Sequence, residues 1–242
     1  MRYAIISDIH ANPAALEKVL ADSARYGVEK IVCAGDLVGY GPDPTRVVRI
    51  VRECGIVAVM GNHDAAVVGL RSIDGMIGHA QDASMRHRAE LSKDDLDWLG
   101  SLPYVYEDGV IAVAHANFEN PAAMGYVNDR LDAQRSFFRR EERMLFVGHT
   151  HVEALYAFGF DSDPRFPDCK AHEPSDFKAV DGWRYLINVG SVGYPRARLH
   201  SSYVLYDSET GNVLFRRIAF DVANYIAELR EKSMSVPGFL MS

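Results

Sequence analysis

The stretch Tyr3-Ala-Ile-Ile-Ser-Asp-Ile-His-Ala-Asn-Pro13 opens the chain with the pattern that decides its fold. Residues 3–7 form a short apolar run that is typical of a buried strand. The pair Asn12-Pro13 then supplies the residues expected at an N-cap and at the first helical position. The stretch therefore predicts a strand, a helix and, in the loop between them, two polar side chains, Asp8 and His10.

The strand and helix pattern repeats along the first sixty residues. A helix is expected over about 13–26 and ends at Gly27, and a second apolar strand follows at 30–34. Another helix over 44–54 precedes a third strand at 56–60. Such alternation predicts a largely parallel sheet with helices on its faces.

The middle of the chain adds helices and two further strands. Residues 64–100 have a mainly helical pattern and are expected to pack as a partial cover over the domain. Strands are predicted at 110–114 and 144–147, with a helix near 130–140 between them. The strands extend the α/β pattern of the N-terminal part.

The last third is rich in predicted strands, at 154–158, 185–189, 202–207 and 212–220. The polar segment 159–182 contains three prolines and is expected to be a surface excursion: a plain loop, a lid or a contact in a homodimer. No repeat or linker divides the chain. Residues 1–242 are therefore predicted to form one α/β domain in which two mixed sheets face each other, with helices outside.

The composition is that of an ordinary globular protein. Of the 242 residues, 48% are hydrophobic, enough for a sizeable core, and the formal net charge is −7. This acidic balance argues against binding of nucleic acid or of an anionic membrane by bulk electrostatics. No leader or membrane-spanning run is recognised, and three widely spaced cysteines indicate no disulfide framework, so a cytoplasmic location is expected.

Metal-capable side chains follow five of the predicted strands. They are Asp8, His10, Asp36, Asn62, His63, His115, His149 and His151. Because open α/β sheets bind ligands at the carboxyl ends of their strands, these side chains are expected to meet in one crevice. A single such residue is usually a cap or a turn former, but the joint pattern predicts a site. His79, His87 and His200 lack this context and are expected at the surface.

The stretch Met144-Leu-Phe-Val-Gly-His-Thr-His151 ends in two histidines separated by one threonine. On its own, such a pair is more often a turn with solvated side chains than a site. In an extended segment, however, side chains at i and i+2 share a face, which places the two imidazoles about 7 Å apart along the backbone. Asp8 and His10 have the same spacing, and the other strand ends favour a metal site here.

The chemistry of the set favours a borderline divalent metal. Carboxylate, imidazole and amide ligands without thiolate suit Mn, Fe, Co, Ni or Zn. The set exceeds the needs of one ion, so two ions that share a carboxylate are predicted. Asp36, which follows the adjacent strand, is placed to bridge them.

The motifs D-x-H, G-D, G-N-H-D, a lone His and G-H-x-H, in this order over residues 4–195, resemble those of the calcineurin-like metallophosphoesterase family. The resemblance implies a four-layer α-β-β-α sandwich with a dinuclear metal centre. It further implies that one ion is held by Asp8, His10, Asp36 and His151, and the other by Asp36, Asn62, His115 and His149. His63 would bind no metal and would donate a proton to the leaving group after attack by a metal-bridging hydroxide.

Two positions depart from the protein Ser/Thr phosphatases of this superfamily, which read G-D-x-x-D-R-G. Gly39 stands where the aspartate partner of the catalytic histidine would be, and Tyr40 stands where the phosphate-binding arginine would be. Both departures argue against a protein phosphatase, and the missing arginine argues against a bis-nucleoside tetraphosphatase. The chain is more similar to small bacterial and archaeal phosphoesterases with G-D-x-x-G-Y-G-P, which implies phosphodiester hydrolysis.

Residues 187–196 resemble the N-x-G-S segment that lies near the site in this family. Tyr40, Tyr194 and Arg196 are predicted to contact substrate, since an arginine fork suits a phosphate oxygen and a tyrosine can flank an ester group. A packed turn is the alternative.

The expected function is hydrolysis of a small phosphoester, with two divalent ions as cofactors and manganese as the first choice. Two alternatives stay open. One is a DNA exonuclease on the same fold, and the other is a non-catalytic member that binds a metal, a nucleotide or a protein partner.

Overall fold

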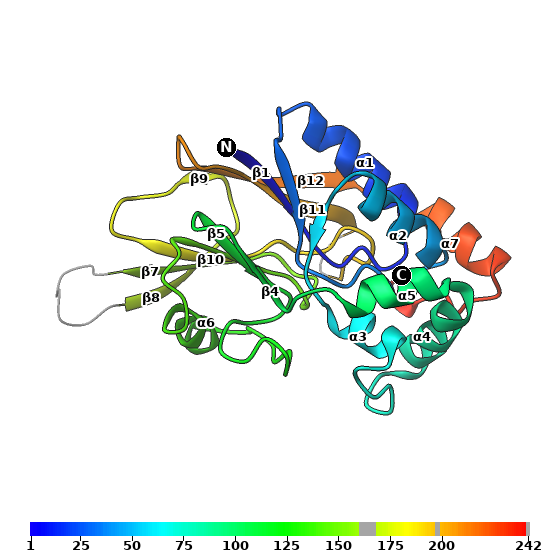
Figure 1. The fold of residues 1–242 in the computed structure, drawn as a ribbon. Coiled ribbons are helices and arrows are strands. Elements are labelled where there is room, and N and C mark those ends of the chain that lie inside the picture. Colours follow the sequence, from blue (N-terminus) through cyan, green and yellow to red (C-terminus); the bar gives the residue numbers. More distant parts are fainter. Residues whose placement is uncertain (160–167, 197–198, 241–242) are drawn as a thin grey trace.

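The computed structural model describes residues 1–159, 168–196 and 199–240. Within these ranges two six-stranded sheets lie face to face (Figure 1). The first sheet contains, from edge to edge, β3 (Val57–Ala58), β2 (Lys30–Cys33), β1 (Arg2–Ile6), β11 (His200–Asp207), β12 (Asn212–Ala219) and β9 (Phe177–Lys178). The second contains β4 (Val105–Glu107), β5 (Ile111–Ala114), β6 (Met144–Val147), β10 (Arg184–Asn188), β7 (Ala154–Gly159) and β8 (Asp168–His172).

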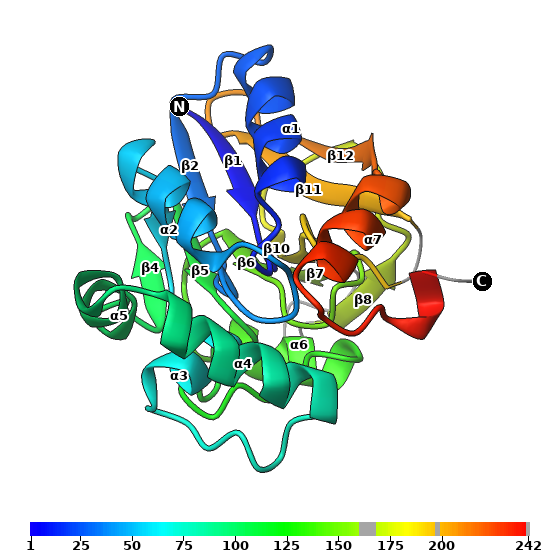
Figure 2. The same ribbon diagram turned by 90° about the vertical axis from the view of Figure 1, so that its right-hand side faces the viewer.

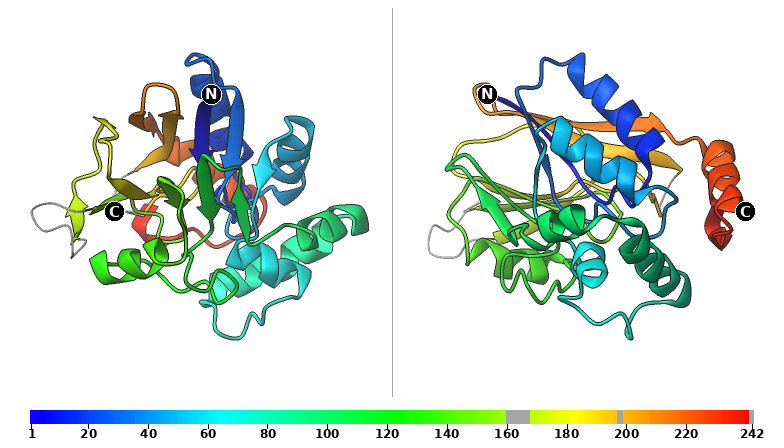
Figure 3. Two further views of the ribbon diagram at one scale, coloured as in Figure 1. Left: turned by 60° about the vertical axis from the view of Figure 1, so that its left-hand side comes forward. Right: turned by 45° about the vertical axis from the view of Figure 1, so that its right-hand side comes forward.

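Helices cover the outer face of each sheet. α1 (Pro13–Ala24) and α2 (Pro44–Glu53) lie on the first sheet, and α6 (Arg130–Phe137) lies on the second (Figure 3). α1 begins where the sequence predicts it, because the Asn12 side chain accepts a hydrogen bond from the backbone N–H of Ala15 at 3.0 Å. The predicted four-layer α-β-β-α sandwich is confirmed.

Three apolar clusters separate the four layers. Ile5 and Val32 of the first sheet meet Phe146 and Ile187 of the second between the sheets. A second cluster packs α1 and α2 on the first sheet, and a third packs Phe137 of α6 against the second sheet. Side chains of one strand alternate between two clusters, as the period of a strand requires, so both faces of each sheet are buried.

The strand directions bring one end of both sheets to the same place. β1, β2 and β3 are parallel, and so are β5, β6 and β10. Beyond the carboxyl ends of these strands lie α3 (Asn62–Val68), α4 (Gly78–Glu90) and α5 (Lys93–Gly100), with α7 (Val222–Glu231) beside them (Figure 2). A one-turn helix, Gly238–Leu240, follows α7.

Several elements differ from the sequence-based prediction. The segment 159–182 contains the strands β8 and β9, although its residues 160–167 lie outside the described ranges. Both strands lie at sheet edges and are short or largely exposed, so they lack the apolar alternation that marks a strand. β4 and α7 were not predicted either, and β3 is shorter than expected.

None of the helices in the described part of the chain combines the length and the apolar character that a membrane span requires.

Candidate metal centre

The strands end before the predicted ligands, and the backbone then turns sharply. Five of these ligands have the positive φ angles of the left-handed region: Asp8 (52°), His10 (48°), Asp36 (55°), His149 (69°) and His151 (62°). This conformation is unfavourable for residues with a Cβ, so surrounding contacts must hold it. The expectation that His149 and His151 share one face of an extended segment is wrong, since β6 ends at Val147.

Hydrogen bonds between the loops hold these turns together. The backbone N–H groups of Asp8 and His10 donate to the carbonyls of Gly35 and Asp36, each at 3.0 Å. The N–H of Gly148 donates to the carbonyl of His115 at 2.8 Å. The loops that follow neighbouring strands therefore continue to pair beyond the sheets, and this pairing brings their side chains together.

The segment 187–196, which resembled a site segment in sequence, joins two of the loops. The Asn188 side chain donates to the carbonyl of Gly148 at 2.6 Å, and the Ser191 hydroxyl donates to the carbonyl of Asp8 at 2.9 Å. Asn188 and Ser191 are both buried. They position the backbone that carries the ligands.

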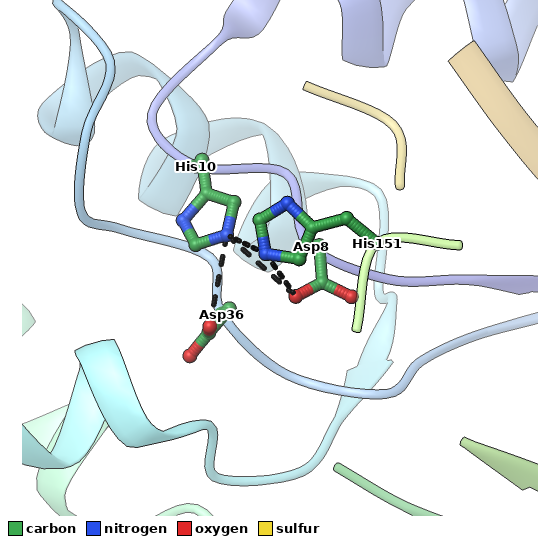
Figure 4. A group of neighbouring side chains, drawn as sticks. All are labelled: Asp8, His10, Asp36 and His151. Atoms are coloured by element: carbon green, nitrogen blue, oxygen red, sulfur yellow. Dashed lines mark hydrogen bonds and ion pairs between the residues drawn. The ribbon is translucent and has the colours of Figure 1, made fainter. Parts of the chain in front are cut away.

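The predicted ligands form two groups that share Asp36. Asp8, His10, Asp36 and His151 place one potential ligand atom each within 4.8 Å of the others (Figure 4). Asp36, His115 and His149 form the second group, and the side-chain oxygen of Asn62 lies 3.0 Å from Nε2 of His115. His149 and His151 thus belong to different groups, and all seven predicted ligands lie together.

Backbone carbonyls fix how the imidazoles present their nitrogens. Nδ1 of His10 lies 3.0 Å from the carbonyl of Val38, Nδ1 of His115 lies 2.8 Å from that of Ala34, and Nδ1 of His151 lies 2.6 Å from that of Tyr194. Because a carbonyl only accepts, each Nδ1 carries a proton and donates. In the neutral ring, Nε2 then presents its lone pair to the centre, which is the usual arrangement of a metal-binding histidine.

The two buried carboxylates each leave one oxygen facing these lone pairs. Oδ2 of Asp8 accepts the N–H of His149 at 2.9 Å, and Oδ1 of Asp36 accepts the N–H of His63 at 2.8 Å. The other oxygens, Oδ1 of Asp8 and Oδ2 of Asp36, are buried and have no hydrogen-bond partner. Buried oxygens and lone pairs that converge in this way form a favourable site for a cation.

The spacing of the ligand atoms fits divalent ions. An ion about 2.0–2.2 Å from each ligand, in tetrahedral or octahedral geometry, separates neighbouring ligand atoms by roughly 2.8–3.6 Å. Nε2 of His10 lies 3.1 Å from Nε2 of His151, and Nε2 of His115 lies 3.0 Å from Nδ1 of His149. Oδ2 of Asp36 lies 3.6 Å from Nε2 of His10 and 3.4 Å from Nε2 of His115. Both groups therefore fit a metal ion.

Burial governs the protonation of the imidazoles. It lowers the pKa of His149 to about 4 and that of His151 to about 3, so both rings are neutral at pH 7. Burial also opposes a charge on His115, but the Asp36 carboxylate outweighs it and raises the pKa of His115 to about 9. A metal ion in the second group must displace that proton.

His63 lies beside the two groups rather than in them. It is the second residue of α3, and its side chain lines the cavity above the ligands. Its ring is buried, and Nδ1 has no hydrogen-bond partner. A Cβ at Gly39 would lie 2.4 Å from that nitrogen, so the ring of His63 occupies the space that a side chain at position 39 would need.

Asp64, for which no role was predicted, closes the loop at the end of β2. Its buried carboxylate accepts backbone N–H bonds from Asp36, Leu37, Val38 and Gly61 at 2.9–3.2 Å. This carboxylate thereby holds the loop of Asp36 against the start of α3. The residue lies in the G-N-H-D motif, but the sequence does not show that its target is backbone on another loop.

A cavity of about 820 Å³ opens above the ligands. Tyr40, Tyr194 and Arg196, the predicted substrate contacts, all line it. The two tyrosine rings stack at 4.2 Å, and Nη2 of Arg196 donates to the hydroxyl of Tyr40 at 3.3 Å. The tyrosines are largely buried, whereas Arg196 is exposed, so the guanidinium is the more accessible of the three groups.

Other residues of the cavity wall were not predicted. Tyr126 stacks on the His149 ring at 4.1 Å, and Arg71, Met76 and His79 also line the cavity. They belong to loops and to the start of α4, whose sequences have no motif. The only sequence signal was that these loops are long, and long loops at the ends of strands often carry binding residues.

His87 was expected at the surface, and this prediction is wrong, because its side chain is fully buried. Its Nδ1 accepts the N–H of Gly39 at 3.0 Å, and its Nε2 then donates to the carbonyl of Gly41 at 2.9 Å. The ring therefore bonds the backbone on both sides of Tyr40 and holds that residue at its positive φ of 56°. Helical spacing on α4 gave a signal that the prediction overlooked, since Ala80, Ala83 and Ser84 lie on the same buried face.

The family model of the calcineurin-like phosphoesterase superfamily domain matches residues 1–211. The chain belongs to this superfamily. The metallophosphoesterase from Sphaerobacter thermophilus is 33% identical in sequence, and its crystal structure superimposes with a TM-score of 0.81 over 100% of this chain and 97% of that one.

Two archaeal proteins are also similar. An uncharacterized protein of Methanocaldococcus jannaschii is 32% identical over 225 residues, which cover 90% of this chain and 88% of the relative. A hypothetical protein from Pyrococcus horikoshii, 18% identical, has the same fold, with a TM-score of 0.76 over 99% of this chain and 96% of that one. The superfamily match and the two ligand groups together support a metal-dependent hydrolase of phosphate esters.

The buried ring of His87 predicts a specific loss of stability in acid. Burial lowers its pKa to about 4 from an ordinary value of 6.5, so the unfolded chain binds a proton more readily than the folded one. The stabilisation is complete above pH 6.5 and declines as the pH falls towards 4, by about 3 kcal/mol in total.

His87→Gln is the matched variant, because it retains a donor and an acceptor but does not titrate. Denaturant unfolding with chelator present is expected to show a smaller decrease between pH 7 and pH 4 for the variant than for the wild type. Equal decreases would contradict this assignment.

Proposed function

We propose that the protein is a phosphodiesterase that binds two divalent ions, one in each ligand group, with Asp36 as the shared ligand. The observation that carries the proposal is the pair of ligand groups joined at Asp36 on the floor of the cavity. Asp8, His10, Asp36 and His151 would hold one ion, and Asp36, Asn62, His115 and His149 the other. When bound, such ions activate a water molecule and offset the charge that develops on phosphate.

His63 is placed to act on the leaving group. It faces the cavity beside the ligands and makes no hydrogen bond through Nδ1 that would fix its protonation state. Burial lowers the pKa of His63, so its protonated ring, formed beside an anionic ester, is a strong proton donor. In this role the imidazole protonates the departing alkoxide.

Tyr40 stands at the motif position where related phosphatases have a phosphate-binding arginine. In this protein Arg196 supplies a cation at the cavity wall instead. Its guanidinium is accessible at the cavity wall, and its hydrogen bond to the Tyr40 hydroxyl directs it there. A diester carries one negative charge, which one arginine beside the ions can bind. The cavity volume of about 820 Å³, with Tyr126 and Met76 among the lining residues, also has room for a second ester group, which favours a small diester as the substrate.

Asp36→Asn tests the shared ligand. Wild-type protein loaded with manganese is expected to hold about two ions per chain and to hydrolyse bis(p-nitrophenyl) phosphate, since two-ion centres activate water for phosphoester hydrolysis. The variant weakens both ion sites at once, so its metal content is expected to fall below about one ion per chain and its activity by at least about a hundredfold.

Asp181→Asn is the control for that experiment, because the Asp181 carboxylate is fully exposed. Metal content is measured by elemental analysis after gel filtration. An Asp36→Asn protein with full metal content and activity would contradict the role of Asp36. Two bound ions without turnover of any diester would favour the non-catalytic alternative.

His63→Ala tests the proton donor. The variant is expected to keep its metal content, and its kcat for methyl phenyl phosphate is expected to fall by about 10²–10⁴-fold. The decrease for methyl p-nitrophenyl phosphate is expected to be much smaller, because p-nitrophenolate departs without a proton. His172→Ala, an exposed histidine on β8, is the control. An equal decrease for both esters would show that His63 does not donate the proton.

A further inference from the structure

One wall of the cavity is formed by the end of the chain. Ser235, Val236, Pro237 and Gly238 line it, and the loop that contains Arg71 and Ile77 lines another part of the same cavity. These residues lie beyond residue 211, where the match to the superfamily model ends. The wall is therefore an addition to the part of the chain that carries the metal ligands. We call residues 233–240 the C-terminal segment.

The C-terminal segment is anchored at both ends. At its start, Arg86 of α4 donates a hydrogen bond to the carbonyl of Lys232, and the N–H of Met234 donates to the carbonyl of Leu229 at 2.8 Å. At its end, Leu240 is only 6% exposed and belongs to an apolar cluster with Tyr40, Tyr194 and Tyr225. The segment thus leads from α7 to the apolar cluster that contains the two tyrosines of the site.

The space behind the segment is hollow. A second cavity of about 260 Å³ lies there, lined by Asp82 and Arg86 of α4. Both cavities share Tyr40, His79, Tyr194, Ser235 and Pro237 as lining residues. Because Ser235 and Pro237 line both cavities, displacement of the segment would join the two spaces.

The side chains on this side of the site have a distinct chemistry. Met76, Ile77, Val236 and Pro237 form an apolar surface, whereas the arginines Arg71 and Arg196 also line the cavity. An apolar or aromatic ester group can lie on the former while the phosphate lies among the histidines and Arg196.

We propose that Val236 and Pro237, together with Met76, form a subsite for the non-leaving ester group of a compact phosphodiester, and that the C-terminal segment limits the size of that group. This inference rests on the proposed phosphodiesterase function. It assigns the choice of substrate to a segment that holds none of the proposed metal ligands.

The test uses two diesters with the same leaving group, methyl p-nitrophenyl phosphate and thymidine 5′-(p-nitrophenyl phosphate). Val236→Trp fills the subsite, so the ratio of kcat/KM for the thymidine ester to that for the methyl ester is expected to fall at least about tenfold. Leu240→Ser detaches the wall, so the same ratio is expected to rise. Val180→Trp and Leu131→Ser, at exposed positions outside the cavity, are the controls.

A binding measurement that needs no turnover accompanies the kinetics. Calorimetry with the thymidine ester of methylphosphonate, which lacks a good leaving group, is expected to show weaker binding to Val236→Trp than to the Val180→Trp control. Thermal unfolding confirms that each variant is folded before its ratio is interpreted.

The outcomes separate the two proposals. In one outcome the wild type hydrolyses both esters while Val236→Trp and Leu240→Ser keep the wild-type ratio of the two kcat/KM values. That result would overturn the subsite but leave the phosphodiesterase function intact. No hydrolysis of either ester by the metal-loaded wild type would overturn the function and, with it, the subsite.

Discussion

The structure depends on two buried carboxylates, each with one oxygen that has no hydrogen-bond partner among the described residues. In Asp8 and in Asp36, one carboxylate oxygen accepts a hydrogen bond from a backbone N–H of another loop. The other oxygen faces histidine nitrogens and is the one without a hydrogen-bond partner. An ionised carboxylate without a partner is very unfavourable in such an interior. A cation resolves this imbalance for both residues, and the same ligand atoms have the spacing that a divalent ion needs. A bound divalent ion would therefore stabilise the folded state as well as supply the proposed chemistry.

The strain in the site is held by contacts from distant parts of the chain. Five ligands have left-handed backbone conformations, and these turns are paired with one another across the ends of the sheets. Asn188 and Ser191 bind the carbonyls beside the ligands, and Asp64 binds the loop of Asp36. Because each anchor is itself buried, the site is shaped before any ion arrives, which favours tight binding of a defined geometry.

Much of the site could be predicted from sequence, for a simple reason. Parallel strands of a sheet end at the same edge, so the polar residues after β1 and β2 had to lie near one another, and so did those after β5 and β6. The two sets meet because the two sheets lie face to face and these strands end on the same side of the molecule. The backbone between His149 and His151 was predicted wrongly, because a period of two assumes an extended chain and the strand stops at Val147. The hydrogen bonds of His87 to Gly39 and Gly41, and the position of the C-terminal segment beside Tyr194 and Tyr225, are contacts between distant parts of the chain, which no local pattern reveals.

The central claim is that Asp36 is shared by two metal ions. Crystals grown with manganese allow a direct measurement, by anomalous difference maps recorded on either side of the manganese absorption edge. We expect two peaks about 3.5–4 Å apart, with the Asp36 carboxylate between them and His115 and His10 on opposite sides. A single peak, or two peaks of which only one contacts Asp36, would contradict this claim.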